Sequence, residues 1–410
     1  MSFKRSTLYG VMLTAISAQA LAQDSMGSFV EDSKLDAKFR TFYFNRDFEG
    51  RNDAIAAAQA LRLDYQSGYA SDLIGFDASL FAVGKLSGDT GEGGTGVLQT
   101  NSDGSQSGYT KIGQAYLKLK LGQEAQLKAG RMVTDTPLFN DSDSRITPSS
   151  TQLVMIDGAL NGVDLYGIWS DKASAKTEDG FHHYVDNQGN DYEVIVVGGG
   201  YTFDNQLSVH AAHGEADNVL RQTYFNISYP MELAQEMTLL LDAHHYIGKA
   251  DGDGALDSVG SDYDSDLTNL AAQLRYQQMK FTLSYQAVNG DEYEESWDGF
   301  THDDNSLVTW NSVQRLDFDR ADERSWQARF DYKFKSVPGL SFMTRYTRGD
   351  NIDTGAGPDG KEWERNVEMR YNFPYVEGLS LRWRNSTVRS TETSNTDENR
   401  LILNYNIALL

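Results

Sequence analysis

Basic side chains at alternate positions are the residues of this chain best suited to chemistry. A guanidinium group binds a carboxylate through two parallel hydrogen bonds, and a lysine binds it as a point charge. A row of such groups binds small anions at a series of modest sites and passes them along without trapping them. Nine residues form the predicted basic wall: Lys38, Arg40, Arg62, Arg329, Arg345, Arg370, Arg382, Arg384 and Arg400. The alternative interpretation is structural, with these cations paired to acidic residues on neighbouring strands: Asp36, Asp64, Asp331, Glu364 and Glu368.

Residue patterns for catalysis or metal binding give no comparable signal. The sequence has no cysteine and no G-x-S-x-G nucleophile elbow. The spacing of His210 and His213 places the two rings on opposite faces of a strand, and consecutive histidines also point apart. We therefore assign no metal site, no cofactor and no catalytic residue, and we expect the protein not to be an enzyme.

The elements that position the basic side chains are predicted to be β-strands. Apolar and polar residues alternate almost from end to end, as in 35–43, 76–82, 115–121, 326–334 and 401–409. In the segment 363–373 the apolar row is Trp363, Val367, Met369, Tyr371 and Phe373, and Arg365 is an exception near one end. Such segments have about the ten residues that a tilted strand needs to cross a bilayer.

The connections alternate between short turns and long polar loops. Short turns are predicted at 203–206, 337–339 and 374–378, and long loops at 84–108, 133–150, 171–190, 248–265, 289–322 and 349–361. This asymmetry is typical of a transmembrane antiparallel β-barrel and favours about 18 strands. All six prolines fall at strand ends or in connections. The predicted fold is therefore an all-β barrel with an aqueous lumen.

Composition and the first residues of the chain indicate export. With 36 basic and 59 acidic residues the net charge is −23, which argues against nucleic acid as a partner. Lys4 and Arg5 precede a short apolar stretch at 8–16 and the cleavage motif Ala20-Leu21-Ala22. We therefore expect a signal peptide at 1–22, a single barrel domain at 23–410, and localisation in the outer membrane of a Gram-negative bacterium.

Acidic residues gather in two of the long loops. Asp251-Gly252-Asp253-Gly254 hints at a calcium loop, but the rest of that pattern is missing. A second group, Asp291, Glu292, Glu294 and Glu295, lies in the loop 289–322. We expect both to be solvated surface loops near the mouth of the channel. An acidic surface is also suited to divalent ions shared with lipopolysaccharide.

Several short motifs, in this order along the chain, resemble the OprD-type porins, a family of substrate-selective channels that includes chitoporin-like members. They are Phe29-Val30-Glu31-Asp32-Ser33, Lys128-Ala129-Gly130-Arg131-Met132, Thr136-Pro137-Leu138-Phe139, Ser144-Arg145-Ile146-Thr147-Pro148-Ser149, Leu160-Asn161-Gly162-Val163-Asp164-Leu165, and the stretch 378–386. The resemblance implies an 18-stranded barrel, monomeric or loosely trimeric, that carries a ladder of basic side chains.

The resemblance also implies that the third extracellular loop, about 133–150, folds inward as a constriction. Its candidate residues are Asp135, Phe139, Asp141, Asp143 and Arg145. The loop departs from the family in being more acidic. Acidic groups opposite a basic wall would set up a transverse field, and Phe139 would narrow the opening. Alternatively, the loop only covers a turn.

The function predicted from the sequence is an outer-membrane porin for passive diffusion of small polar solutes, with carboxylates such as amino acids and small organic acids favoured. Its partners are then outer-membrane lipid, lipopolysaccharide and the solutes themselves. A channel for chitooligosaccharides or other sugars is the alternative. An outer-membrane barrel enzyme, such as a protease or phospholipase, is a third hypothesis, and conduction in planar bilayers distinguishes it from a porin.

Overall fold

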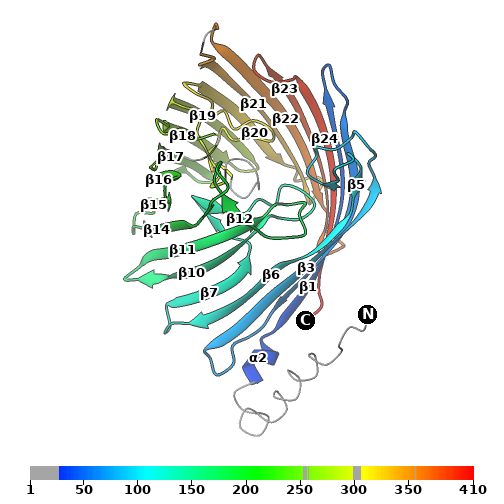
Figure 1. The fold of residues 1–410 in the computed structure, drawn as a ribbon, viewed down its shortest axis with the longest axis vertical. Coiled ribbons are helices and arrows are strands. Elements are labelled where there is room, and N and C mark those ends of the chain that lie inside the picture. Colours follow the sequence, from blue (N-terminus) through cyan, green and yellow to red (C-terminus); the bar gives the residue numbers. More distant parts are fainter. Residues whose placement is uncertain (1–26, 253–255, 257, 299–305, 356) are drawn as a thin grey trace.

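The computed structural model describes residues 27–252, 256, 258–298, 306–355 and 357–410. In this part of the chain, 18 long antiparallel strands form one closed barrel (Figure 1). The predicted signal peptide lies outside the described residues. The predicted fold is confirmed, including the number of strands.

The barrel strands follow one another around the ring in chain order. They are β1 (Lys34–Phe48), β2 (Ala54–Gln66), β3 (Ile74–Ser87), β6 (Tyr109–Lys120), β7 (Ala125–Met132), β10 (Ser150–Leu160), β11 (Val163–Ser174), β14 (Val194–Thr202), β15 (Ser208–Ala216), β16 (Leu220–Ala234), β17 (Met237–Ala250), β18 (Asp264–Tyr276), β19 (Met279–Gly290), β20 (Arg324–Lys333), β21 (Leu340–Ile352), β22 (Gly360–Asn372), β23 (Leu379–Ser390) and β24 (Thr396–Ala408). Short strands lie within the loops: β4 (Gln99–Thr100), β5 (Gln106–Ser107), β8 (Asp135–Thr136), β9 (Phe139–Asn140), β12 (His182–Val185) and β13 (Asp191–Tyr192).

Pairing between β1 and β24 closes the ring, with Asp36 opposite Ala408 at one end and Phe48 opposite Thr396 at the other. Closure leaves no strand edge in the bilayer, where unpaired backbone groups would have no water to bind. Register also decides the direction of each side chain. On β1, Phe39 and Tyr43 are exposed on the outer face, whereas Phe42 and Phe44 are buried inside. Period-two alternation thus sorts side chains between lipid and lumen, as predicted.

Short turns join the strands at one end of the barrel, and two of them depend on glycine. Gly339 (φ +90°) and Gly378 (φ +77°) both adopt the left-handed conformation. A Cβ atom at either position would lie 2.0 Å from a backbone carbonyl oxygen, that of Asn372 or Asn406 respectively. Only glycine fits both constraints. The short helix α2 (Gly27–Glu31) and the C-terminus lie at this same end (Figure 1).

Among the described residues, no helix is both long enough and apolar enough to cross a bilayer.

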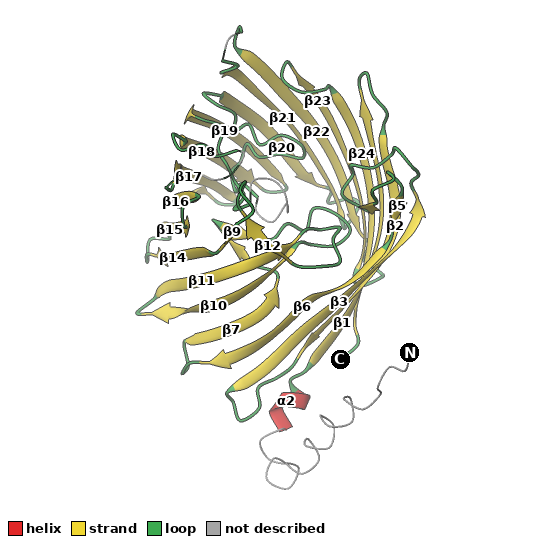
Figure 2. Cartoon of the chain, viewed as in Figure 1, coloured by secondary structure: helices red, strands yellow, loops and turns green. Residues whose placement is uncertain are grey.

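Long loops join the strands at the other end, and several fold back into the ring (Figure 2). Their apolar side chains form two buried clusters against the inner wall. The larger cluster packs Leu138, Phe139, Trp297 and Leu307 against inward residues of β11 to β19. The smaller packs Val97, Leu98 and Ile146 against Phe42 and Phe44 of β1. The loops thereby fill much of the lumen, and the open space that remains is concentrated along the opposite strands.

Candidate functional site

All nine residues of the predicted basic wall lie on the inner face of the barrel. Eight of them stand directly opposite one another as cross-strand pairs of like charge: Lys38 and Arg62, Arg329 and Arg345, Arg370 and Arg382, Arg384 and Arg400. Like charges directly opposite each other destabilise a sheet. Four such pairs on neighbouring strands show that the stability of the sheet alone does not explain this arrangement.

Nearby carboxylates neutralise part of the basic wall, as the structural alternative predicted. Asp64 contacts both Lys38 (2.8 Å) and Arg62 (2.6 Å), so a single acid serves two cations. Glu368 is shared in the same way by Arg382 (2.6 Å) and Arg384 (3.3 Å). Because the acids are shared, the wall keeps an excess of positive charge.

Two cations of the wall form no ion pair with any described residue. Arg345 donates from Nε to the Asn366 side-chain oxygen at 2.7 Å. Arg370 is exposed and donates from Nε to the Asn372 side-chain oxygen at 3.2 Å. Both guanidinium groups therefore keep donors for an incoming anion.

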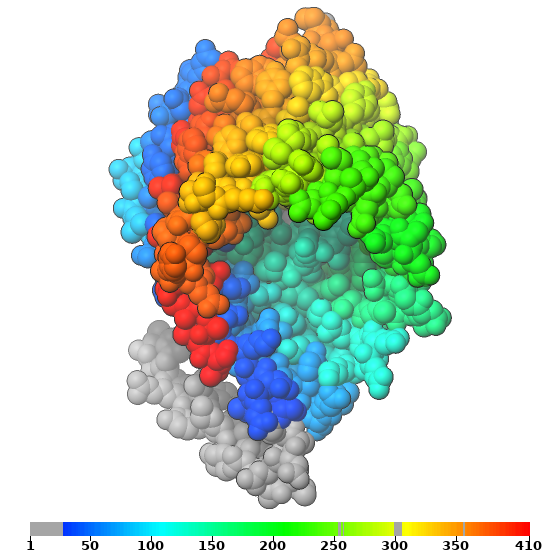
Figure 3. Space-filling view, turned by 180° about the vertical axis from the view of Figure 1, so that it is seen from behind, coloured from blue at the N-terminus to red at the C-terminus, as the bar shows by residue number. Residues whose placement is uncertain are grey.

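Two cavities lie along the wall. One, of about 390 Å³, is bordered by seven cations and two acids: Arg275, Lys280, Arg329, Lys333, Arg345, Arg382, Arg384, Asp331 and Glu368. The other, of about 300 Å³, is bordered by Lys38, Arg40, Arg62, Arg370 and Asp143. Register connects them, because Arg370 of the second cavity faces Arg382 of the first. Figure 3 shows a hollow in the molecule below a rim of orange, yellow and green residues, with teal residues recessed inside it.

Arg400 is the exception among the nine residues. It is only 1% exposed, and its guanidinium binds Glu398 at 2.6 Å. Arg46 binds the same carboxylate at 2.5 Å. The prediction that Arg400 borders an open path is therefore wrong. The loop 291–323, which the structure describes at 291–298 and 306–323, covers Arg400, whose Nη2 donates to the Gln314 carbonyl oxygen.

The loop 133–149 reaches the basic wall through Asp143 and Arg145. Arg40 donates to the two Asp143 carboxylate oxygens at 2.7 and 3.2 Å, and to the Arg145 carbonyl oxygen at 2.6 Å. The Arg145 side chain turns away and donates to the Thr95 carbonyl oxygen at 2.7 Å. The loop thus folds into the lumen as predicted and brings one exposed carboxylate against the wall.

The other predicted constriction residues do not border the path in the way expected. Asp141 is turned into its own loop, where it accepts hydrogen bonds from Thr134, Ser149 and Thr151. Burial raises the pKa of the Asp141 carboxyl to about 6. Phe139 is 3% exposed and packs in the larger apolar cluster, so it does not narrow an opening. Asp135 is exposed in β8, and it borders neither cavity of the wall. Of the three acidic residues expected to set up a transverse field, only Asp143 therefore faces the basic wall.

The loop 291–323 forms a second inward segment that the sequence analysis placed at the surface. Trp310 donates to Asp242 of β17 at 2.7 Å, Leu316 donates its backbone N–H to Glu364 of β22 at 2.9 Å, and Gln314 donates to Glu398 of β24 at 3.2 Å. The loop therefore crosses the lumen from one wall to the other. Glu294 is 1% exposed, so the expectation of a solvated acidic loop is wrong for this residue.

Comparison with known proteins decides the family. The sequence model of a protein family, described as "outer membrane porin, OprD family", matches residues 27–409. The chain belongs to the OprD family of outer-membrane porins. It is 31% identical to Porin D of Pseudomonas aeruginosa, with 99% of this chain and 96% of that protein aligned, and 28% identical to the Porin-like protein GalP of Pseudomonas putida, with 99% and 100% aligned.

Solved structures of OprD-family relatives share the fold. The structure of Pseudomonas aeruginosa OpdK with vanillate has a TM-score of 0.83 at 28% identity, covering 93% of this chain and 100% of that one. A BenF-like porin from Pseudomonas fluorescens has a TM-score of 0.82 at 27% identity, with the same coverage. The protein is therefore an outer-membrane porin, and its relatives are channels rather than enzymes.

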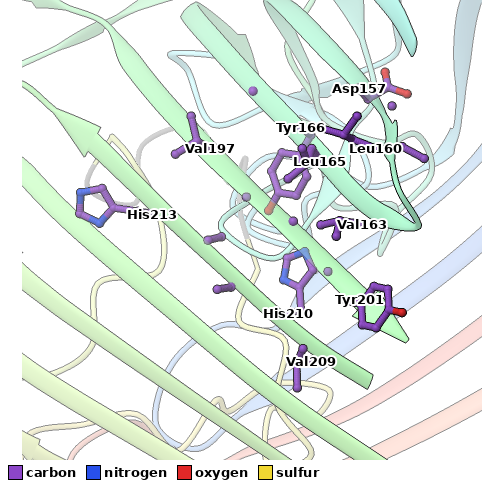
Figure 4. Close-up of a pocket in the computed structure, with 18 of the residues that line it drawn as sticks. Asp157, Leu160, Val163, Leu165, Tyr166, Val197, Tyr201, Val209, His210 and His213 are labelled. Atoms are coloured by element: carbon purple, nitrogen blue, oxygen red, sulfur yellow. The ribbon is translucent and has the colours of Figure 1, made fainter. Parts of the chain in front are cut away.

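The histidines of this OprD-family porin lie as the strand geometry predicted. In Figure 4, His210 points to the Tyr166 ring while His213 of the same strand points elsewhere. The His210 and Tyr166 ring centroids are 5.9 Å apart and stacked. His213 instead bonds Thr223 on the outer face at 2.8 Å. The predicted calcium pattern includes residues 253 and 254, which lie outside the described residues.

Sequence reasoning missed three cations that border the larger cavity, Lys333 of β20 and two others. Arg275 of β18 and Lys280 of β19 also stand opposite each other across neighbouring strands. Both occupy the polar face of an alternating segment next to a short turn, so the same period-two argument would have found them.

Proposed function

We propose that this porin passes small solutes that carry a carboxylate, such as amino acids and small organic acids, by passive diffusion along the basic wall. The observation that carries the proposal is the set of four like-charge pairs across neighbouring strands. A sheet that gained nothing from binding anions would avoid this repulsion. A carboxylate lying between two such cations relieves it.

The arrangement favours passage over tight binding. Asp64 and Glu368 already form ion pairs with cations of the wall. A solute carboxylate must therefore compete with these acids for the N–H donors. Arg370 and Arg345, which have no ion pair among the described residues, offer the stronger sites. A series of sites that are each only moderately strong lets a solute enter the path and leave it again.

The relatives support an organic carboxylate. The similar OpdK structure was solved with vanillate, which is a carboxylate. The cavities of about 390 and 300 Å³ suit a solute of that size. The inner tyrosines Tyr224 and Tyr246 are buried under the loops, so they offer little ring surface for stacking a sugar.

The experiment is a liposome-swelling panel with amino acids, small organic acids and neutral sugars of similar size. We expect Arg370→Gln, and separately the pair Arg382→Ala and Arg384→Ala, to slow carboxylate uptake by about tenfold while sugar uptake changes little. Arg348→Gln is the matched control, because this half-buried arginine lies on the same strand as Arg345 but on the outer face. Equal uptake of carboxylates by wild type and the lumen variants would refute the proposal. Faster uptake of sugars than of carboxylates by wild type would favour the sugar channel.

A further inference from the structure

Arg365 lies on the outer surface of the barrel, in a row that otherwise faces lipid. On β22 its inner neighbours Glu364 and Asn366 are 0% and 1% exposed, whereas Arg365 itself is exposed. The next outer positions of the strand, toward the short turns, are Val367 and Met369. A lipid-facing arginine costs about 2–4 kcal/mol at the middle of a bilayer and less toward its surface. A cation in this position therefore needs compensation.

The aromatic residues beside Arg365 place it at the outer edge of the apolar belt. Trp326, Tyr346 and Trp363 form a row of rings on β20 to β22, with centroids 5.5 and 5.6 Å apart. Aromatic side chains of barrels gather at the two membrane surfaces. This row lies toward the long loops, while Tyr371 and Phe373 lie near the short turns at the other end of β22. Arg365 is thus at the level of the outer-leaflet headgroups.

The hydrogen bonds that Arg365 donates to described residues go to neutral acceptors. Its Nη2 donates to the Asn385 side-chain oxygen at 3.2 Å and to the Thr387 hydroxyl at 3.0 Å. No described carboxylate forms an ion pair with it, although the neighbouring outer arginines Arg348 and Arg389 each pair with an aspartate. These partners hold the Nη2 group, while Nε and Nη1 of Arg365 donate to no described residue.

More polar groups extend the same patch. Asn385 donates from Nδ2 to the Asn399 side-chain oxygen at 3.3 Å, and Asn45 of β1 stands opposite Asn399 in register. Asn385 and Thr387 contact the cation, and Asn399 and Asn45 continue the row of outward hydrogen-bonding groups over the next two strands. A phosphate has the charge and the acceptor oxygens that such a surface binds.

We propose that this patch, Arg365 with Asn385, Thr387, Asn399 and Asn45, binds a phosphate of an outer-leaflet glycolipid, the lipid A of lipopolysaccharide. The negative phosphate compensates an outward cation that forms no ion pair with any described residue, and the acyl chains of the same lipid cover the apolar residues below. This site is separate from the solute path, because Arg365 and the basic wall lie on opposite faces of the sheet.

The test is a titration of the purified porin in detergent with lipid A that carries two phosphates, one phosphate or none, followed by native mass spectrometry. We expect bound lipid to fall with each phosphate removed. We expect Arg365→Gln to weaken binding of the diphosphorylated form by about tenfold, and Arg365→Lys to restore part of it. Arg221→Gln is the matched control, because this outward arginine on β16 pairs with Asp251.

Equal binding of phosphorylated and phosphate-free lipid A by wild type would overturn the proposal, and this result does not depend on any variant. An equal loss of lipid A binding in Arg221→Gln and Arg365→Gln would also overturn the proposal, since the net charge of the protein alone would then explain the binding. If light scattering shows that Arg365→Gln dissociates an oligomer, the patch is a contact between copies and the proposal is overturned. Conductance of Arg365→Gln should match wild type, so failure of this proposal and of the solute proposal are distinguishable.

Discussion

Truncation of Trp297 should release the two inward loops from each other. Its side chain is fully buried in the larger apolar cluster, and its Nε1 donates to the Leu138 carbonyl oxygen at 2.7 Å. Its own carbonyl oxygen accepts from the Tyr192 hydroxyl at 2.5 Å. Trp297 therefore ties its own loop to the loop 133–149 and to β13, and its ring also lies against Gly214 of β15 in the wall.

The magnitude follows from its burial. Replacing a buried Trp by Ala costs about 3–5 kcal/mol. Each 1.4 kcal/mol is tenfold in an equilibrium constant, so the ratio of released to docked loop should rise by about two to three and a half orders of magnitude. Trp297→Phe keeps most of the apolar contact and loses only the hydrogen bond to the Leu138 carbonyl oxygen, for about 0.5–1.5 kcal/mol.

Single-channel recording in planar bilayers is the assay. We expect Trp297→Ala to increase conductance and reduce anion selectivity, with Trp297→Phe intermediate. Trp326→Ala is the control, because this Trp is 45% exposed on the outer face. Heat-modifiable gel mobility checks that each barrel is folded. Unchanged conductance and reversal potential in folded Trp297→Ala would refute the idea that these loops set the width of the path.

Three further predictions concern other parts of the molecule. Burial raises the pKa of Asp141 to about 6 from an ordinary 3.8, so its contribution to loop stability is favourable at low pH and is lost as the pH rises through about 6. Amide protection in 133–149, corrected for the pH dependence of intrinsic exchange, should therefore be greater at about pH 5 than at about pH 7.5, and Asp141→Asn should remove that difference in protection. Gly378→Ala should lower the urea midpoint more than Gly355→Ala, because both have φ near +77° but only Gly378 has a carbonyl oxygen 2.0 Å from the new Cβ; equal midpoints would contradict this. Lys280→Gln should shift the reversal potential away from anion selectivity without changing the urea midpoint, and an unshifted potential would exclude Lys280 from the path.

The strands were predictable because the signal is repeated in every one of them. Lipid on one side and water on the other impose alternation over ten or more residues, and register then carries each side chain to a known face. This is why nine basic residues scattered from Lys38 to Arg400 could be assigned to one inner wall without coordinates. The same rule singled out Arg365, whose outward position breaks the apolar row.

The inward loops were less predictable because a loop has no period. The burial of Arg400 and Phe139 depends on segments distant in sequence, which reach them by tertiary packing. One local signal was present: Phe42 and Phe44 make the inner face of β1 apolar, which is unfavourable beside water. An apolar inner face predicts that a loop covers it, and the aromatic residues Trp297 and Trp310 in a supposedly solvated loop point the same way.

The seam where β1 meets β24 divides the basic wall into two parts. The first two strands carry one part, with Lys38, Arg40 and Arg62. The strands β22 and β23 carry the other, with Arg370, Arg382 and Arg384. Neither half forms the anion path by itself. A chain that ends before its final strand is an open sheet, in which the two halves of the basic wall do not meet. Transport by this protein thus begins only when assembly has finished.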